Sequence, residues 1–340
     1  MATIKDVSKH AGVSPATVSR VLNNSELVVE KTRIKVMAAV EALGYRPNTL
    51  ARAMASGRSG IVGMVVPEMS SPIHARFIGE AEKLFRQHKI QLIGASGHCD
   101  PEQEREAIEF LLQCRCDALI LLVEAIDDGY LKELAEREAN VVLINRQVTG
   151  LDSHCITLDN VNGSFTATEH LIELGHQRIG CITGPQNKQD ARERFEGFQQ
   201  ALQQHQLIQN PAWLIEGEFT EKSGYQAMAK LIDQQLTAVF CGNDEMAFGA
   251  LAYCREHGIS VPQQISIMGF DDLHFASYTF PALTTMHFPA DTMAVAATEF
   301  LLSRCYDIAS ASSAPVMTYL PTLVSRDSVA DIRNHAHASL

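Results

Sequence analysis

The first 45 residues carry apolar side chains at helical spacing in three short segments. Helices are predicted over residues 4–11 and 15–23, because apolar positions recur every three or four residues in each. Each helix is too short to be stable alone in water, so both must pack against a following element. A third helix, over residues 31–43, supplies that element. The apolar positions expected to close this core are Ile34, Val36, Ala39, Val40 and Leu43.

The link between the first two helices is three or four residues long, which is typical of a helix-turn-helix. Thr3 is expected to cap the first helix, and Gly12 to end it in the left-handed conformation. Ser14 is expected to cap the second helix, with Pro15 at its first position. The second helix then exposes Ala16, Thr17, Ser19 and Arg20. Short side chains and one guanidinium suit an approach to base edges in the major groove.

From Ile61 onward, short apolar runs alternate with helical segments, which is typical of parallel α/β sheets. Strands are predicted over residues 61–66, 90–95, 118–123 and 141–145. After about residue 161 the pattern restarts, with strands over 178–183, 237–241 and 265–269. Ligands of such sheets bind beyond the carboxyl ends of the strands, so the loops there are the candidate ligand sites.

The composition of the 340-residue chain is that of an ordinary globular protein with two or three domains, because 46% of its residues are hydrophobic and 20% charged. No apolar run reaches membrane-spanning length, and the amino terminus lacks the pattern of a secretory signal. We therefore expect a cytoplasmic protein without membrane contacts. The eight cysteines include no Cys-x-x-Cys pair, so we expect them to be reduced and mostly buried, with no metal site.

The charge of the chain is unevenly distributed. The net charge is -12, which taken alone argues against nucleic acid as a partner. Residues 1–60, however, carry nine Lys and Arg against four Asp and Glu, whereas the remaining 280 residues carry 19 basic and 36 acidic side chains. A basic head on an acidic body indicates phosphate binding at one end of the chain. A three-helix cap without a ligand is the alternative for the head, and the basic excess argues against it.

Two other classes of protein fit the sequence less well. A nucleotide-dependent enzyme would need a glycine-rich phosphate loop, and a hydrolase a nucleophile elbow, and neither motif occurs. We therefore expect no enzyme activity, no catalytic residue and no cofactor. A transport component that binds sugar would need a secretory signal and would have no use for a basic head.

Four stretches of the head resemble the lactose-repressor family of transcription regulators: residues 4–7 (IKDV), 11–14 (AGVS), 16–23 (ATVSRVLN) and 44–48 (GYRPN). The similarity continues to about residue 328. This resemblance implies a homodimer that places two helix-turn-helix heads on one pseudo-palindromic, double-stranded DNA operator. The fold it implies is an all-α head followed by an α/β body of two doubly wound subdomains, similar to periplasmic sugar-binding proteins.

The resemblance also implies boundaries. The head would span residues 1–46, a hinge helix and linker 47–60, the effector-binding and dimerisation domain 61–328, and a tail 329–340. Within the body, one subdomain would comprise about 61–160 and 290–321, and the other about 161–289 and 322–328. The tail has no leucine heptads of the kind that build a coiled coil, so we expect a dimer rather than a tetramer.

In this family the hinge folds on entering the minor groove, where an apolar wedge opens a base step. Met54 stands where the family usually has leucine, and a passive tether is the alternative for this segment. Phosphate contacts are expected from Lys5, Lys31, Arg33 and Arg52, among others. The full set of expected DNA-binding residues is Thr3, Lys5, Ser14, Pro15, Ala16, Thr17, Ser19, Arg20, Asn23, Lys31, Arg33, Asn48, Ala51, Arg52 and Met54.

The candidate effector residues lie mainly in the second half. Asn243 and Asp271 follow predicted strands and suit the hydroxyls of a sugar, which both donate and accept hydrogen bonds. Arg194 offers a planar fork to adjacent oxygens, and Phe219 could stack on a pyranose. These four match effector positions of the family, as does Asn162. His74 is a possible donor, in a loop that lacks the two aromatic residues often found there in the family. The neighbouring acids Asp244 and Asp272 are interpreted as helix-start residues.

Several scaffold stretches resemble the galactose-repressor branch of the family most, namely residues 106–109, 115–119, 143–146 and 321–324. A monosaccharide inducer that releases the protein from its operator is therefore the first hypothesis, with galactose as the leading candidate. The alternative within the family is a purine, a nucleoside or a phosphorylated sugar that acts as a co-repressor. The sequence leaves the sign of the switch open.

Overall fold

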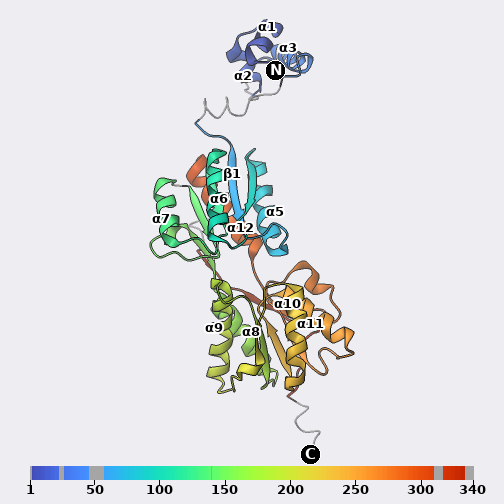
Figure 1. Cartoon of the computed structure of the whole chain (residues 1–340). Helices are drawn as coiled ribbons and strands as arrows, with labels where there is room; N and C mark the ends of the chain where they lie inside the picture. The colour runs from blue at the N-terminus through green and yellow to red at the C-terminus, as the bar shows by residue number, and fades with distance from the viewer. Residues whose placement is uncertain (1, 23–26, 46–56, 139, 310–316, 334–340) are drawn as a thin grey trace, which may run out of the picture. The chain divides into compact units, whose positions relative to one another are not determined.

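The computed structural model describes residues 2–22, 27–45, 57–138, 140–309 and 317–333 (Figure 1). The chain divides into two compact units, residues 1–60 and residues 61–340. We call these units the head and the body.

The head contains the three predicted helices, α1 (Ile4–Ala11), α2 (Pro15–Leu22) and α3 (Glu30–Ala42). They enclose a small apolar core, which explains why such short helices are stable together. Its fully buried members are Val7, Val18, Val21, Val36 and Ala39. The prediction that Ile34 belongs to this core is wrong, because its side chain is 61% exposed. On α3 the buried stripe passes through Val36 and Ala39, so the face that carries Ile34 points to solvent.

The predicted caps of the head are confirmed. Thr3 Oγ1 accepts a hydrogen bond from the Asp6 amide, while the Thr3 amide donates to the Asp6 carboxylate at 2.8 Å. Gly12 ends α1 at φ 63°, a left-handed conformation that glycine adopts without strain. Ser14 Oγ accepts a hydrogen bond from the Thr17 amide at 3.1 Å and so caps α2. These local contacts set the angle between α1 and α2.

The first sheet of the body has the strand order β11-β5-β4-β3-β1-β2, and all its pairs are parallel. Its strands are β1 (Ile61–Val66), β2 (Gln91–Ser96), β3 (Ala118–Leu121), β4 (Val141–Ile144), β5 (Cys155–Leu158) and β11 (Thr318–Tyr319). Successive side chains of a strand point to opposite faces, and the core divides accordingly. Ile120 packs with α5 (Pro72–Gln87) and α12 (Ala290–Tyr306), whereas Leu119 packs with α6 (Pro101–Gln113) and α7 (Asp128–Arg137).

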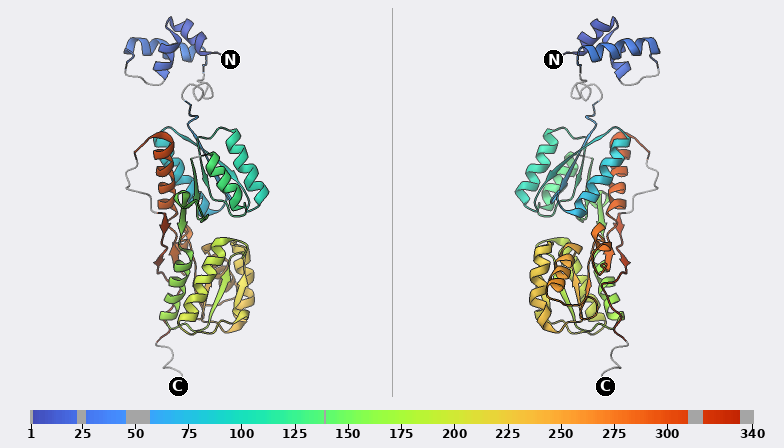
Figure 2. Two further views of the ribbon diagram at one scale, coloured as in Figure 1. Left: turned by 90° about the vertical axis from the view of Figure 1, so that its left-hand side faces the viewer. Right: turned by 90° about the vertical axis from the view of Figure 1, so that its right-hand side faces the viewer.

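The second sheet has the order β7-β6-β8-β9, and its pairs are also parallel. Its strands are β6 (Ile179–Thr183), β7 (Leu214–Glu216), β8 (Ala238–Cys241) and β9 (Ser266–Met268). Helices cover both of its faces, as Figure 2 shows. They are α8 (Asn160–Glu173), α9 (Gln189–Gln204), α10 (Glu221–Leu231) and α11 (Asp244–Glu256). An antiparallel ribbon of β10 (Thr285–His287) and β12 (Thr322–Val324) forms a third, separate sheet.

All seven predicted strands are present, with ends that shift by one or two residues. Five further strands, β5, β7, β10, β11 and β12, are absent from the sequence-based prediction. Each has only two to four residues, too few to show a periodicity of its own. Four of them pair with partners far away in the sequence: β11 adds to β5, and β12 pairs with β10. Only the assembled body supplies those partners.

No helix in the described part of the chain is long and apolar enough to cross a membrane. Within the same residues, no group of three or more His, Cys, Asp and Glu is placed to hold a metal ion. All eight cysteines are free thiols, and five of them are buried.

Candidate functional site

The outer face of α2 is the candidate DNA-reading surface of the head. Ala16 and Arg20 are exposed, and Thr17 and Ser19 are partly exposed, as predicted. The Thr17 hydroxyl lies 2.9 Å from the Ser14 hydroxyl, so both belong to the cap as well as to this surface. The Arg20 side chain is the one cation on α2.

The other residues expected at the DNA are at least partly exposed or lie outside the described residues. Thr3, Lys5, Pro15 and Lys31 are exposed. Arg33 is partly exposed, and its Nε lies 3.6 Å from a carboxylate oxygen of Glu30. Five of the expected residues, Asn23, Asn48, Ala51, Arg52 and Met54, lie outside the part of the chain that the structure describes.

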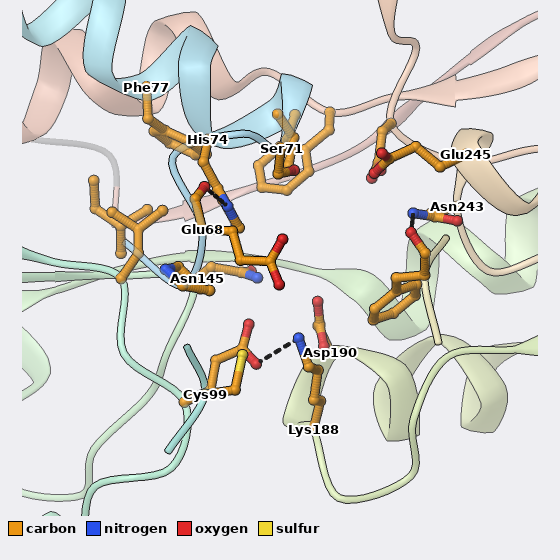
Figure 3. A pocket seen from close by; sticks show the side chains of 18 of the residues that line it. Glu68, Ser71, His74, Phe77, Cys99, Asn145, Lys188, Asp190, Asn243 and Glu245 are labelled. Atoms are coloured by element: carbon orange, nitrogen blue, oxygen red, sulfur yellow. Dashed lines mark hydrogen bonds and ion pairs between the residues drawn. The ribbon is translucent and has the colours of Figure 1, made fainter. Parts of the chain in front are cut away.

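The body holds a cavity of about 180 Å³ between its two parallel sheets (Figure 3). Loops that follow the carboxyl ends of strands line it, as expected for parallel α/β sheets. We call the part from the first sheet the first side; it comprises Pro67, Glu68, Ser70, Ser71, Ile73, His74, Phe77, Cys99, Leu122, Val123, Glu124, Ile144 and Asn145. We call the part from the second sheet the second side; it comprises Lys188, Asp190, Arg194, Glu218, Phe219, Thr220, Asn243, Glu245 and Asp271.

Arg194 is the most firmly held group of the second side. It lies in the first half of α9 and is only 4% exposed. Its Nε donates to Asn160 Oδ1 at 3.0 Å, and its Nη1 donates to the Gly242 carbonyl at 2.6 Å. The guanidinium also stacks on Phe270, with its central carbon 3.9 Å from the ring centroid. The fork is therefore oriented before any ligand arrives.

Asn243 and Phe219 are linked by a hydrogen bond. Asn243 caps α11, because its Oδ1 accepts from the Met246 amide at 2.9 Å. Its Nδ2 donates to the Phe219 carbonyl at 3.1 Å. Phe219 has a φ of 57° and lies against Gly184, where an added Cβ would come within 2.1 Å of the ring. The ring thus forms a fixed wall of the cavity.

Asp271 completes the second side. It is 4% exposed, and Arg194 Nη1 lies 3.1 Å from its Oδ1. Among the described residues, that oxygen has no hydrogen bond of good geometry. Burial raises the pKa of Asp271 to about 6, although Arg194 acts in the opposite direction. A buried acceptor with spare capacity suits a ligand hydroxyl.

The two acids interpreted as helix-start residues differ from each other. Asp244 does begin α11, and its carboxylate also accepts from the Leu273 amide and the Thr285 hydroxyl at 2.7 and 2.6 Å. Asp272 begins no helix, so that interpretation is wrong. Its oxygens instead contact Arg326 and His287 at 2.6 and 3.0 Å, because the chain turns back there toward β10.

The first side presents polar groups with few partners. His74 Nδ1 lies 2.9 Å from the Glu68 carbonyl, and burial lowers the pKa of the ring, so the imidazole is neutral near pH 7. The Glu68 carboxylate forms no ion pair with any described residue and projects into the cavity (Figure 3). Ser71 lies just before α5 and adds a hydroxyl.

One ion pair joins the two sides. Lys188 Nζ lies 3.0 Å from Glu124 Oε2 (Figure 3). Burial alone would lower the pKa of Lys188, but the Glu124 carboxylate outweighs burial, and the pKa lies above its ordinary value. Burial and the charge of Asp190 raise the pKa of Glu124 despite this lysine. Burial and the nearby charge of Glu124 also raise the pKa of the Cys99 thiol, to about 12, so the thiol stays protonated.

Glu104 on α6 holds the loop that carries Glu124. Its side chain is 1% exposed, and its two carboxylate oxygens accept hydrogen bonds from three consecutive backbone amides. These are the amides of Glu124, Ala125 and Ile126, at 2.7 to 3.2 Å. The backbone of this loop is thus fixed by a residue that does not line the cavity.

Comparison with known proteins decides the family. The family model described as bacterial regulatory proteins, lacI family, matches residues 3–48, and a periplasmic binding protein-like domain matches residues 168–329. The transcriptional regulator GalS of Salmonella typhimurium is 43% identical over 333 residues, 97% of either chain. GalR of Escherichia coli is 41% identical over 334 residues, 97% of this chain and 96% of GalR. The chain belongs to the lacI family.

The fold agrees with this assignment. The crystal structure of the lac repressor dimer bound to operator and the anti-inducer ONPF is similar, with a TM-score of 0.83 and 27% identity. The similarity covers 97% of this chain and 99% of the repressor. This lacI-family protein is therefore a DNA-binding transcription regulator related to GalR and GalS, which are regulators and not enzymes. The predicted fold class, a helical head and a periplasmic-binding-protein-like body, is confirmed.

The cavity brings together five of the six effector residues expected in this lacI-family protein. They are His74, Arg194, Phe219, Asn243 and Asp271. Asn162 is not among the residues that line it. Its backbone amide donates to Asp159 Oδ1 at 2.9 Å, the bond by which Asp159 caps α8, so the backbone of Asn162 is fixed at the start of that helix.

Sequence reasoning missed several polar groups that line the cavity: Glu68, Ser71, Cys99, Glu124, Asn145, Lys188, Asp190, Glu218 and Glu245. A usable signal existed for some of them. Glu68, Glu124 and Asn145 lie within three residues of the ends of predicted strands, where ligands of parallel sheets bind. No sequence signal indicates that Glu124 and Lys188, 64 positions apart, would pair.

Proposed function

We propose that this protein is a homodimeric repressor that leaves a pseudo-palindromic operator when a galactose-type monosaccharide binds the cavity. The observation that carries the proposal is the prearranged second side, where Arg194, Asn243 and Asp271 lie around the same space as the Phe219 ring. Such a set offers donors, acceptors and one apolar wall, which is what a sugar ring requires.

The size of the cavity supports a small ligand. One water needs roughly 10–15 Å³ of such space, so about 180 Å³ holds on the order of a dozen waters. That is the scale of one sugar ring rather than an oligosaccharide. Galactose is the first candidate because the scaffold stretches of this chain resemble the galactose-repressor branch.

In the head, we propose that α2 lies in the major groove. Ala16, Thr17, Ser19 and Arg20 would contact base edges, with Arg20 forking onto a guanine. At the starts of α1 and α2, Thr3, Ser14 and Pro15 would approach the sugar-phosphate backbone of the DNA. Asn23, which follows α2 in the sequence, would approach the DNA from the other end. Phosphates would be neutralised by Lys5, Lys31, Arg33 and Arg52. In the hinge, Asn48 and Ala51 would line the minor groove around the Met54 wedge.

The switch that we propose uses the two sides of the cavity. A sugar that contacts both sides stabilises one relative placement of them. If that placement separates the paired hinge segments at 48–55, each segment loses its partner and leaves the minor groove. Operator affinity then falls, and by linkage the operator weakens sugar binding by the same factor.

The test begins with a thermal-shift screen of monosaccharides, nucleosides and purine bases on the full chain. Each compound that stabilises the protein is then added to a complex with duplex DNA that the protein selects from a random pool, and release is followed by fluorescence anisotropy. We expect galactose to stabilise the protein and to weaken DNA binding at least about tenfold, within the usual range of allosteric coupling. A purine that stabilises the protein and strengthens DNA binding would contradict both the sugar and the sign.

Variants separate the two activities. Arg194→Ala and Asp271→Ala are expected to bind the selected DNA but to ignore galactose, whereas Arg192→Ala, an exposed neighbour on α9, keeps the response. Arg20→Ala should cost about 1–3 kcal/mol on the selected DNA and relax discrimination at one base pair. Equal weakening on selected and random DNA would assign Arg20 to a phosphate contact instead.

A further inference from the structure

The cavity carries far more negative than positive groups. Two cationic side chains line it, Lys188 and Arg194. Six carboxyl groups line it: Glu68, Glu124, Asp190, Glu218, Glu245 and Asp271. His74 adds no charge near pH 7, because burial lowers the pKa of its ring.

Both cations are already engaged with carboxylates of the protein. Lys188 lies 3.0 Å from Glu124, and Arg194 lies 3.1 Å from Asp271 while it also donates to Asn160 and Gly242. An anionic ligand would have to take one of these cations from its partner. It would then leave a carboxylate uncompensated at the wall of the cavity, which is costly in a partly buried site.

Four carboxyl groups remain, and none of them forms an ion pair with a residue that the structure describes. Glu68 comes from the first side, and Asp190, Glu218 and Glu245 come from the second. Figure 3 shows the carboxylates of Glu68 and Asp190 projecting into the cavity from opposite sides, with that of Glu245 at its edge. The space between them is negative from more than one direction.

The raised pKa values of two carboxyl groups agree with this excess of negative charge. Burial and the charges of Glu221, Asp271 and Glu68 raise the pKa of Glu245 to about 7. Burial also raises the pKa of Asp271 to about 6, even next to Arg194. A cation in the cavity would relieve this repulsion.

We propose that the effector is a sugar that carries a protonated amine, an amino sugar, whose ammonium group lies between Glu68, Asp190 and Glu245. The inference rests on the proposed function, since it specifies the ligand of the same cavity. The ring hydroxyls keep the partners described above, Arg194, Asn243 and Asp271. The same carboxylates disfavour phosphorylated sugars, uronic acids and nucleotides, which are anions.

The experiment compares four probes by isothermal titration calorimetry with the full chain: galactosamine, N-acetylgalactosamine, galactose and galacturonic acid. At about pH 7 a large share of the amine is protonated, because an amine beside electron-withdrawing groups resembles the α-amino group of a chain, whose pKa is about 7.7–8.0. We expect galactosamine to bind about tenfold more tightly than galactose, in line with a screened interaction with two or three carboxylates. Added salt should weaken the binding of galactosamine and leave that of galactose unchanged. Galacturonic acid should not bind.

N-acetylation separates charge from shape, because N-acetylgalactosamine keeps the nitrogen but loses the charge. It should bind less tightly than galactosamine. In the variants Glu68→Gln and Glu245→Gln, the ratio of galactosamine to galactose affinity should fall, and in the double variant it should fall about tenfold. The matched control is Glu106→Gln, an exposed glutamate of α6 outside the cavity, which should leave the ratio unchanged.

The outcomes distinguish this inference from the function on which it rests. If galactose binds and releases DNA but galactosamine binds no better, the charge inference is wrong and the proposed function stands. If galacturonic acid binds as tightly as galactosamine, the charge inference is also wrong. If no sugar binds or releases DNA, the proposed function is wrong, and this inference is wrong with it.

Discussion

The two sides of the cavity differ in how their polar groups are held. On the second side, Arg194 contacts three partners and a ring, and Asn243 is fixed by the start of α11. On the first side, Glu68 forms no ion pair among the described residues, and His74 contacts a single backbone carbonyl. A fixed group binds a ligand at little cost in conformational entropy, whereas a loosely held one adapts to what is bound. If the proposed function holds, Arg194 and Asn243 therefore set the orientation of the ligand, and Glu68 adjusts to it.

The substitution expected to change stability most is Arg194→Ala. The change leaves Asp271 buried without its cation and removes the donor to Asn160, so the body should lose about 3–5 kcal/mol of unfolding free energy. Chemical denaturation of the variant and the wild-type chain measures this loss. Arg192→Ala on the same helix is exposed and should change the unfolding free energy by less than about 0.5 kcal/mol.

The double variant Arg194→Ala with Asp271→Asn sharpens the result. It removes both charges of the buried pair, so part of the loss should be recovered relative to Arg194→Ala alone. Equal stability of the single and double variants would mean that Arg194 acts through packing on Phe270 rather than through its charge.

The next largest effect is expected at the Phe219 ring, which forms the wall of the second side. In Gly184→Ala the new Cβ would lie 2.1 Å from Phe219, so the ring must move, at a cost of about 1–3 kcal/mol in unfolding free energy. Sugar affinity should fall as well, because the ring leaves its place. Thermal melts with and without galactose report both changes.

Gly79→Ala on α5, a helix that packs on the first sheet, is the matched comparison. No atom lies within 4 Å of a Cβ added there. Alanine should stabilise that helix by about 0.5–1 kcal/mol, the opposite sign to Gly184→Ala. If the two substitutions had the same sign, Phe219 would not be fixed as described.

A smaller effect is expected for the ion pair between the sides. Glu124→Gln, Lys188→Met and the double variant form a double-mutant cycle, and the coupling energy should be about 1 kcal/mol for this partly exposed pair. Unfolding by urea measures it. Additive effects of the two substitutions would show that the pair contributes nothing in solution, and the sides would then be independent.

A further test is the pH dependence of stability. The pKa of Glu245 is about 7 in the folded chain and 4.5 ordinarily, so the folded state holds more protons between these values. Its contribution to stability is therefore present below about pH 4.5 and is lost as the pH rises through 7. The melting temperature of Glu245→Gln should lack this decline. Since histidines also titrate in this range, the quantity to compare is the difference between the two curves, and parallel curves would contradict the raised pKa.

The same contrast explains how much of the protein was predictable. The head follows from local rules, since Thr3, Gly12 and Ser14 act on residues at most five positions away. On the second side, Asn243 and Asp271 directly follow strands with clear patterns, and family resemblance indicates Arg194. The exposure of Ile34 was not predictable, because it depends on which face of α3 meets the other two helices.

On the first side, position was predictable but role was not. Glu68 and Glu124 follow the predicted strands β1 and β3, yet both are ordinary surface residues by type, so nothing in the sequence selects them as ligand contacts. The short strand β11 also lacks a periodic signal and forms because the chain returns to the first sheet after α12, where it pairs with β5. Asn162 stays a prediction from family resemblance, because it lies outside the lining of the cavity and only its backbone amide takes part in the cap of α8.

The buried carboxylate of Glu104 has a consequence for how specificity can evolve. It holds the amides of residues 124–126 from beneath, so the course of that loop does not depend on the side chain at position 124. A substitution there changes the chemistry of the cavity without requiring the loop to refold. Position 124 is therefore a site at which a descendant of this gene, or a designed library, could change its ligand in one step while the scaffold stays intact.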